Sequence, residues 1–374
     1  MIEGTAQSNE HSPPKFPAYL PGEFWGITTF INPFRYENKL KNYRRFRQST
    51  KQQGLRLLCV ELAKGKSNFQ LNLDDADKLI QLRAEDVLWQ KERLLNIALK
   101  NLPPDCDKIA WLDADIIFSN NLWVSEAANL LQVYNIVQLF SYVVRLFKNQ
   151  NAEKVDISRL SLGDSEGRKI YGIAYSAANF GKHQLQGSFI QQGHTGYAWA
   201  ARRSIFERHG FYDRSILGGA DFLMASAFFD NAEHFFSGFS YGKPLVRDQQ
   251  RWAKGVSEDV QRSVYYVPGV IFHLWHGKFI HRQYDIRARI LSRFNYSPDS
   301  DIELAANGCW KWKANKPLMH FAVKYYFLLR NEEGNFLISL VFCVFRGLFF
   351  CLSWGRKIFK RIKSSLSIFT HQPE

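Results

Sequence analysis

The sequence has few cysteines and no visible targeting segment. Its cysteines are odd in number, scattered and never arranged as CxxC: Cys59, Cys106, Cys309, Cys343 and Cys351. This pattern argues against a disulfide scaffold or a thiolate zinc site and favours a reducing compartment. The first twenty or so residues are polar and contain prolines, so the apolar core of a signal peptide is missing there. We therefore expect a protein that works in the cytoplasm.

Acidic residues are scarce relative to basic ones. The chain has 35 Asp and Glu against 49 Lys and Arg, a formal net charge of +14. Such a charge suits nucleic acid, acidic lipid head groups or phosphorylated substrates without choosing among them. With 46% hydrophobic and 15% aromatic residues the chain is too apolar to be disordered, and 374 residues suffice for one large domain with appendages.

Apolar strands alternate with helical stretches in the first part of the chain. After a disordered lead over 1–22, we predict strands over 24–31, 55–62 and up to the aspartates near 113, with helices over 39–53 and 89–100 between them. This order implies right-handed crossovers and a parallel sheet. Later elements are predicted as follows: helix 122–131, strand 136–144, a polar excursion over 149–182, strand 197–201, helices 204–209 and 221–229, and strand 264–274.

Two carboxylates, Asp113 and Asp115, end the buried strand that begins near Lys108. Ligands of doubly wound sheets bind outside the carboxyl ends of the strands. Two carboxylates there can hold a hard divalent cation, and the cation can hold a diphosphate. The alternative is a pair of aspartates that only caps the following turn.

The order of these motifs resembles a known family. The segments are Trp89-Gln90-Lys91-Glu92, WLDADIIF, GYAWAARRSIFERHGFYD and Gly218-Gly219-Ala220-Asp221. Together they resemble the GT-A glycosyltransferases, particularly bacterial family-2-like enzymes, from about Phe24 to Trp312. A lone DxD is a weak signal, but this succession is more specific.

The resemblance implies a fold and an activity. The fold is a Rossmann-like, mostly parallel α/β sheet flanked by helices, which we place over 23–315. The activity is transfer of a sugar from a nucleotide-sugar, with UDP as the expected nucleotide, to a glycan or glycolipid acceptor. A hexosyl- or N-acetylhexosaminyltransferase of polysaccharide biosynthesis is the expected type.

The resemblance also implies metal ligands. Asp115 is expected to bind Mn²⁺ or Mg²⁺ directly, while Asp113 contacts the ribose or binds the metal through water. A histidine late in the sheet, His273 or His276, is expected to complete the site. The cation would stabilise charge on the leaving diphosphate. The alternative for each histidine is a packed core residue.

Asp221 is the candidate base. An inverting transferase needs a carboxylate to take the proton of the acceptor hydroxyl. Gly218-Gly219 before it would let backbone and acceptor approach closely. Because Asp221 opens a predicted helix, its alternative role is to stabilise the helix N-terminus. Glu258-Asp259 is a possible substitute for the base.

Donor contacts are predicted at both ends of the domain. Thr28, Thr29 and Asn32 lie at the carboxyl end of the first strand, where family members contact the nucleoside base. Lys91 and the cations Lys278 and Arg282 are expected to contact phosphate. His281, Arg287 and Arg289 belong to the same basic stretch. A solvated helix face is the alternative for any one of these cations.

The tail over 316–374 differs from the preceding domain in composition. Residues 336–354 are largely apolar and contain a single charge, Arg346, and 355–363 are strongly basic. We expect a helix at the inner face of the membrane, held by anionic lipids, because a central arginine disfavours a spanning helix. A spanning helix and a buried terminal helix are the alternatives.

Two other function classes stay open. One is a catalytically inactive GT-A-like protein that binds a glycan or another partner, since Asp221 is the only acid of its motif. The other is a nucleic-acid-binding protein, suggested by charge and aromatics. The basic residues are dispersed and no binding motif accompanies them, so nucleic acid is not the expected partner.

Overall fold

The computed structural model describes residues 19–181, 192–230, 241–334 and 338. Its largest element is a seven-stranded sheet with the order β10-β6-β9-β4-β1-β2-β3. All neighbouring strands are parallel except β9, which is antiparallel to β4 and β6. In sheet order the strands are Val264–Tyr266, Ile136–Gln138, Ala198–Arg202, Cys106–Leu112, Glu23–Ile31, Arg56–Lys64 and Lys78–Ala84.

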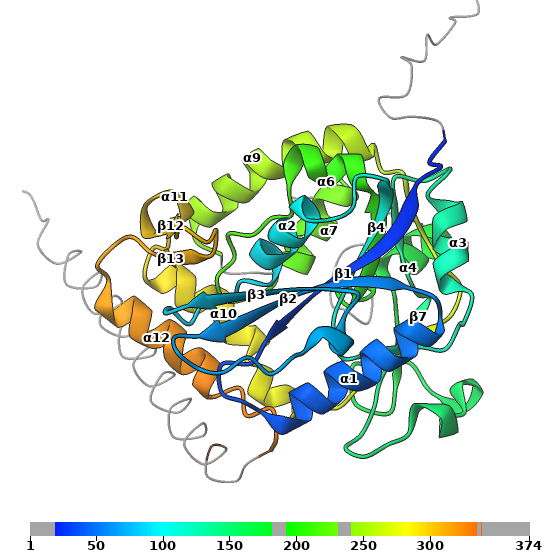
Figure 1. The fold of residues 1–374 in the computed structure, drawn as a ribbon, viewed down its shortest axis with the longest axis horizontal. Coiled ribbons are helices and arrows are strands. Elements are labelled where there is room, and N and C mark those ends of the chain that lie inside the picture. Colours follow the sequence, from blue (N-terminus) through cyan, green and yellow to red (C-terminus); the bar gives the residue numbers. More distant parts are fainter. Residues whose placement is uncertain (1–18, 182–191, 231–240, 335–337, 339–374) are drawn as a thin grey trace, which may run out of the picture.

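Helices cover both faces of this sheet (Figure 1). Helices α2 (Lys91–Lys100), α6 (Arg203–His209), α7 (Ala220–Phe228) and α9 (Lys243–Val260) pack on one face, and α1 (Glu37–Gln52) and α3 (Trp123–Leu130) on the other. The central strands are apolar on both faces because both are buried. The predicted α/β fold with a mostly parallel sheet flanked by helices is confirmed.

A second, four-stranded sheet has the order β5-β11-β7-β8. Its strands are Ile116–Phe118, Val270–His273, Tyr142–Arg145 and Lys169–Tyr171. The predictions of single strands over 136–144 and 264–274 are therefore wrong, because each region contributes one strand to each sheet. In the second region Pro268 and Gly269, with φ of 141°, cause the break. In the first region the apolar pattern continues through the break, so no local signal marks it.

Other elements were not predicted from the sequence. They include the edge strand β3, the long helix α9, and β8 with α4 inside the predicted excursion over 149–182. The remaining helices are α4 (Ile173–Phe180), α10 (Tyr284–Arg293), α11 (Pro298–Asp301) and α12 (Pro317–Leu328), and the 3-10 turns are Leu73–Asp75, Ala152–Lys154, Ile157–Arg159 and Phe279–Arg282. A hairpin of β12 (Ile302–Leu304) and β13 (Trp310–Trp312) lies between α11 and α12.

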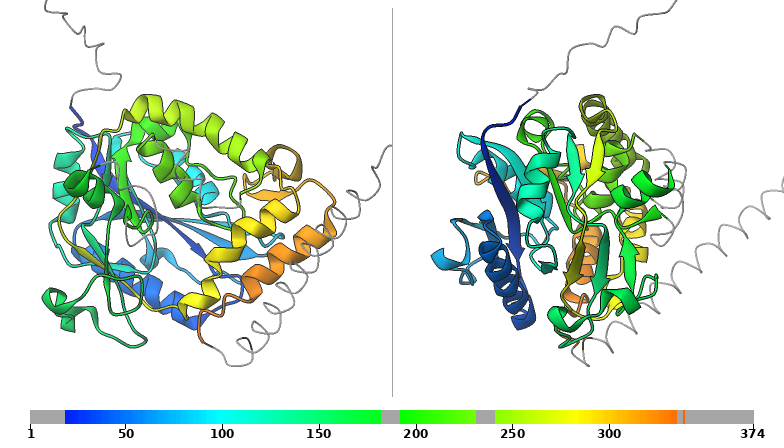
Figure 2. Two further views of the ribbon diagram at one scale, coloured as in Figure 1. Left: turned by 180° about the vertical axis from the view of Figure 1, so that it is seen from behind. Right: turned by 90° about the vertical axis from the view of Figure 1, so that its right-hand side faces the viewer.

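The chain after this hairpin packs back onto the domain. Helix α12 lies beside α10 (Figure 2), and the Gln283 side chain donates a hydrogen bond to the Tyr326 carbonyl at 3.1 Å. Phe327 stacks on Trp89, with ring centroids 6.3 Å apart. The predicted apolar and basic segments over 336–363 lie, apart from residue 338, outside the described residues. Within the described part of the chain, no helix is long and apolar enough to cross a membrane.

The predicted lead over 1–22 also lies mostly outside the described residues. Its last residues are packed, because Leu20 is buried and the Lys108 amine donates to the carbonyls of Leu20 and Gly22. The described chain thus joins the core shortly before β1.

Candidate active site

Three side chains that can bind a metal converge at the carboxyl edge of the sheet. Asp115, His273 and His276 each offer a ligand atom, and these atoms lie within 4.8 Å of one another. Oδ2 of Asp115 is 3.2 Å from Nε2 of His276 and 3.6 Å from Nε2 of His273. Oδ1 of Asp115 is buried with no hydrogen-bond partner among the described residues. Two imidazoles and one carboxylate, whose Oδ1 atom has no partner among the described residues, fit a divalent cation such as Mn²⁺.

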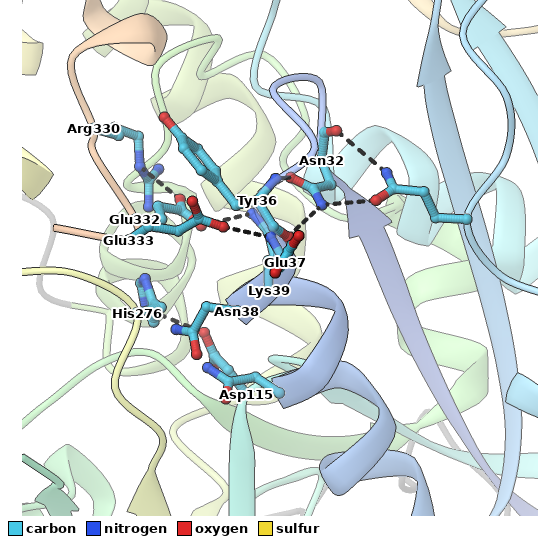
Figure 3. A network of polar contacts seen from close by, with 12 residues as sticks. Asn32, Tyr36, Glu37, Asn38, Lys39, Asp115, His276, Arg330, Glu332 and Glu333 are labelled. Atoms are coloured by element: carbon cyan, nitrogen blue, oxygen red, sulfur yellow. Dashed lines mark hydrogen bonds and ion pairs between the residues drawn. The ribbon is translucent and has the colours of Figure 1, made fainter. Parts of the chain in front are cut away.

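Local pairing explains why these residues meet. Strand β5 runs antiparallel to β11, and this places His273 opposite Ile116, the residue after Asp115. The backbone N–H of Leu274 donates to the Asp115 carbonyl at 2.8 Å. Helix α1 fixes the next loop, because the amides of Asn38 and Asn42 both donate to the Trp275 carbonyl (2.7 and 3.0 Å). His276 is therefore held beside Asp115 (Figure 3).

The charges of the cluster suit metal binding. Burial lowers the pKa of His273 and His276, and Arg282 lowers it further, although Asp115 opposes both effects. Both imidazoles are therefore neutral near neutral pH and can offer a lone pair. Burial raises the pKa of Asp115, but His273, His276 and Arg282 lower it more, so this carboxylate is ionised.

Lys91 links the aspartate pair to the candidate base. Its Nζ atom is 2.6 Å from Oδ1 of Asp113 and 3.1 Å from Oδ1 of Asp221. Burial lowers the pKa of Lys91, but the two carboxylates raise it well above its usual value, so the amine stays charged. Burial, together with the charges of Asp221 and Asp115, raises the pKa of Asp113 to about 6, although Lys91 lowers it. Asp113 thus faces Lys91 and lies outside the cluster formed by Asp115 and the histidines.

Asp221 occupies the first turn of α7, and the N-cap residue of this helix is Gly219. Its Oδ1 atom meets Lys91, while Oδ2 faces Gly196, where an added Cβ would lie 3.4 Å away. No described residue donates a hydrogen bond to Oδ2, and the side chain is 26% exposed. This oxygen is therefore available to accept a hydrogen bond.

One cavity of about 160 Å³ contains these groups. The predicted site residues that line it are Lys91, Asp113, Asp115, Asp221, His273, His276 and Arg282. Arg287 and Thr29 line it as well. The structure therefore brings together residues from β1, α2, the β4–β5 turn, α7, β11 and the region of α10, which are far apart in the sequence.

Several lining residues were not predicted for the site: Lys39, His194, Tyr197, Tyr284, Arg330 and Glu332. Glu332 lies 3.4 Å from the amine of Lys39 and 3.2 Å from Nε of Arg330 (Figure 3). The segment reaches the site because Gly277 has no Cβ, which would lie 2.6 Å from the Asn331 carbonyl oxygen. No local motif marks Arg330 or Glu332, which lie after the domain end predicted at 315.

An aromatic wall supports the histidines. The His194 ring stacks on Tyr197 at 4.2 Å, and Tyr197 lies 4.9 Å from His273. Arg145 donates to the Tyr197 hydroxyl at 3.1 Å. Tyr197 has a positive φ of 78°, which is rare for a residue with a bulky side chain. A positive φ at tyrosine has no sequence signature, so these aromatic contacts beside the histidines could not be predicted from the sequence.

Three predicted donor contacts lie outside the cavity. Thr28 is fully buried and donates to the Leu112 carbonyl at 2.7 Å. Asn32 is used within its own turn, where its amide donates to the Tyr36 carbonyl and its oxygen accepts from the Tyr36 N–H, both at 2.9 Å. Lys278 is exposed and does not line the cavity. Strand-end polarity predicted the right edge of the sheet but not which side chains face the ligand.

The possible substitute base is also elsewhere. Asp259 on α9 pairs with Arg208 at 2.6 Å and with His209 at 2.7 Å. These contacts join α9 to α6, and neither Glu258 nor Asp259 lines the cavity. Among the acids considered for the base, only Asp221 reaches the site.

A scan against protein-family models and a search of curated proteins find no match. Among solved structures, the chain is similar to the catalytic domain of Drosophila β1,4-galactosyltransferase 7 in complex with xylobiose (13% identity, 78% of this chain, 95% of that chain, TM-score 0.32). A mutant of that protein in complex with manganese, UDP-Gal and xylobiose is similar at 14% identity, 75% and 86% coverage and TM-score 0.32. S. aureus TarS shares 10% identity over 82% of this chain and 43% of its own, with TM-score 0.31. The sheet order, with the aspartate pair at its carboxyl edge, is the mostly parallel α/β arrangement that the sequence predicts.

Proposed function

We propose that this protein is a metal-dependent glycosyltransferase that moves a sugar from a nucleotide-sugar to a glycan or glycolipid acceptor. One observation carries the proposal. The cluster of Asp115, His273 and His276 shares a single cavity with the ion-paired group of Asp113, Lys91 and Asp221. Sugar transfer needs these two parts together, a place for a diphosphate and a base for the acceptor hydroxyl.

The donor end is the end with the histidines. A divalent cation, Mn²⁺ or Mg²⁺, held by Asp115, His273 and His276 would supply Lewis-acid stabilisation of the leaving diphosphate. Arg282 lines the cavity at this end and offers charged donors to phosphate oxygens. Asp113 and Thr29 line the cavity near the ends of neighbouring parallel strands, and we propose that they contact the nucleoside, which would be uridine.

The acceptor end is the end with Asp221. Its Oδ2 atom accepts the proton of the attacking hydroxyl, while Lys91 holds Oδ1 and fixes the carboxylate relative to Asp113. With one base opposite the donor, we propose a single displacement with inversion at the anomeric carbon. The sugar transferred would be a hexose or an N-acetylhexosamine.

The test is metal-dependent turnover. Purified full-length protein with Mn²⁺ and a panel of nucleotide-sugars is expected to release nucleoside diphosphate, and Asp115→Ala is expected to abolish release. Asp74→Ala, at an exposed aspartate of the turn before β3, is the matched control and should be fully active. Unchanged turnover in Asp115→Ala would overturn the proposal. Sugar binding without turnover would favour a catalytically inactive binding protein. Metal-independent binding to DNA would favour a nucleic-acid-binding protein.

We further propose that the enzyme works in the cytoplasm at the inner face of a membrane, in polysaccharide synthesis. The support is the apolar and then basic sequence over 336–363, which lies largely outside the described residues. Truncation after Gly334 is expected to move the protein from the membrane to the soluble fraction of a lysate. A truncated protein that stays with the membrane would contradict this part of the proposal.

A further inference from the structure

Arg287 of α10 lies against the turn that precedes Asp221. A Cβ added to Gly219 would be 2.9 Å from Cζ of Arg287, and Gly219 has a φ of 90°. A Cβ on Gly218 would lie 3.6 Å from both Arg287 and Trp89. The two glycines therefore make room for the guanidinium, which lies at the Asp221 end of the cavity.

Arg287 differs from three other cations that line the cavity, Lys39, Lys91 and Arg330. Within the described part of the chain, Lys39, Lys91 and Arg330 each form an ion pair with a carboxylate, whereas Arg287 forms none. Its neighbours are tyrosines: its guanidinium lies 4.8 Å from the centre of the Tyr284 ring, and its charge acts on Tyr326. A partly buried cation that faces a cavity without a counter-charge favours an anion from outside.

Arg282 and Arg287 have different neighbours in the cavity, although both act on His194 and Tyr284. The charge of Arg282 acts on Asp115, His273 and His276, which form the metal cluster. The charge of Arg287 acts on Tyr241 and Tyr326, and its guanidinium lies against the turn before Asp221. A bound cation and Arg282 can balance a donor diphosphate, so Arg287 is left for another anion.

We propose that Arg287 binds an anionic group of the acceptor, so that the enzyme glycosylates an acidic acceptor. The group is a carboxylate or a phosphate close to the hydroxyl that faces Asp221. This inference rests on the proposed function, because Asp221 marks the acceptor end only in a glycosyltransferase.

The test measures by calorimetry how tightly small acceptor probes bind to the full-length protein in the presence of Mn²⁺ and UDP. Methyl β-glucuronide carries a carboxylate, glucose 6-phosphate a phosphate, and methyl β-glucoside neither. Wild type is expected to bind at least one acidic probe about tenfold or more tightly than the neutral one, as for a hydrogen bond to a charged group. The acidic probe that binds identifies the source of the anion.

Variants assign the preference to Arg287. Arg287→Ala is expected to bind all probes with the affinity of the neutral one, and Arg287→Lys to retain part of the preference. Arg289→Ala, two residues along the same helix and exposed, is the matched control and should behave as wild type. Unfolding temperatures of all variants show whether each is folded.

The inference is overturned if wild type shows no preference, or if Arg287→Ala keeps it. It is also overturned if Arg287→Ala weakens UDP binding, because Arg287 would then serve the donor. The proposed function is tested separately, by metal-dependent nucleoside diphosphate release and its loss in Asp115→Ala. Turnover without an acidic preference would leave that function intact and remove only the role of Arg287.

Discussion

At the residue scale, Lys91 joins the two halves of the candidate site. It is the first residue of α2, and its amine contacts an aspartate at the end of β4 and another in the first turn of α7. A lysine in this position is already neutralised by two carboxylates. We therefore interpret Lys91 as a residue that positions Asp113 and Asp221, rather than as the phosphate ligand that the sequence suggested.

Lys91→Met tests this interpretation. Without the amine, Asp113 and Asp221 repel each other and move apart. We expect the rate of transfer to fall about a hundredfold, because displacing a catalytic group by about 1 Å has an effect of that size. Lys100→Met, at the exposed end of the same helix, is the control. Steady-state kinetics with the donor and acceptor varied separately measure the effect. Normal kcat in Lys91→Met would contradict it.

Asp221→Asn separates catalysis from donor binding. The amide keeps the shape of the side chain but cannot take a proton, so we expect transfer to fall by about 10²- to 10⁴-fold. UDP and Mn²⁺ should bind as in wild type, because Asp221 is not part of the metal cluster. Calorimetric titration of UDP supplies this comparison, and weakened UDP binding would indicate a donor-side role instead.

Glu92 makes stability depend on pH. Burial and the charge of Asp221 raise the pKa of this carboxyl from its ordinary value of 4.5 to about 8, although Lys91 lowers it. Between these values the unfolded chain releases the proton while the folded chain keeps it, so the free energy of unfolding falls as pH rises. Glu92→Gln should reduce this fall. Urea unfolding at several pH values between 4.5 and 8 measures it, and an equal fall in both proteins would refute it.

At the element scale, close packing of loops shapes the cavity. The loop after β11 carries His276, and the segment after α12 carries Arg330 and Glu332. Gly277 lets these two segments touch, because a Cβ at this position would lie 2.6 Å from the Asn331 carbonyl oxygen. Hydrogen bonds from α1 hold the same loop on its other side.

Gly277→Ala is expected to separate the two segments. Both Gly277 and Gly54 have positive φ values, 94° and 80°, where alanine costs about 1–2 kcal/mol. At Gly54 an added Cβ meets nothing within 4 Å, so Gly54→Ala reports backbone strain alone. Denaturant unfolding should show a larger loss of stability for Gly277→Ala than for Gly54→Ala. Equal losses would mean that the contact with Asn331 is unimportant.

At the scale of the whole molecule, the candidate metal ligands tie the two sheets together. Asp115 follows a strand of the large sheet, and His273 ends a strand of the small one. A ligand that binds only the folded state stabilises the entire fold by mass action.

Mn²⁺ is therefore expected to raise the unfolding temperature of wild type. At about a hundred times the dissociation constant the stabilisation is about 2.7 kcal/mol. His276→Ala should lose most of this shift, and a chelator should reverse it in wild type. His320→Ala, on α12 outside the cavity, is the matched control. A shift of equal size in His276→Ala would show that Mn²⁺ binds elsewhere.

The sequence by itself determined the class of fold and the main carboxylates of the site. Apolar strands buried on both faces have a pattern that is visible locally, as in β1, β2 and β4. The Asp113/Asp115 pair and Asp221 are likewise readable because each adjoins a strand end or a glycine turn. Their approach to one cavity follows from the parallel sheet that these patterns predict.

Only the tertiary structure decided which side chains face the ligand. Thr28 and Asn32 lie at the predicted strand end but outside the cavity, because Thr28 bonds to Leu112 of the neighbouring strand and Asn32 bonds within its own turn. Arg330 and Glu332 reach it because a distant segment folds back over Gly277. The physical reason is that a motif records local backbone preferences, whereas the contacts of Lys91 and Arg287 are set by how separate elements pack.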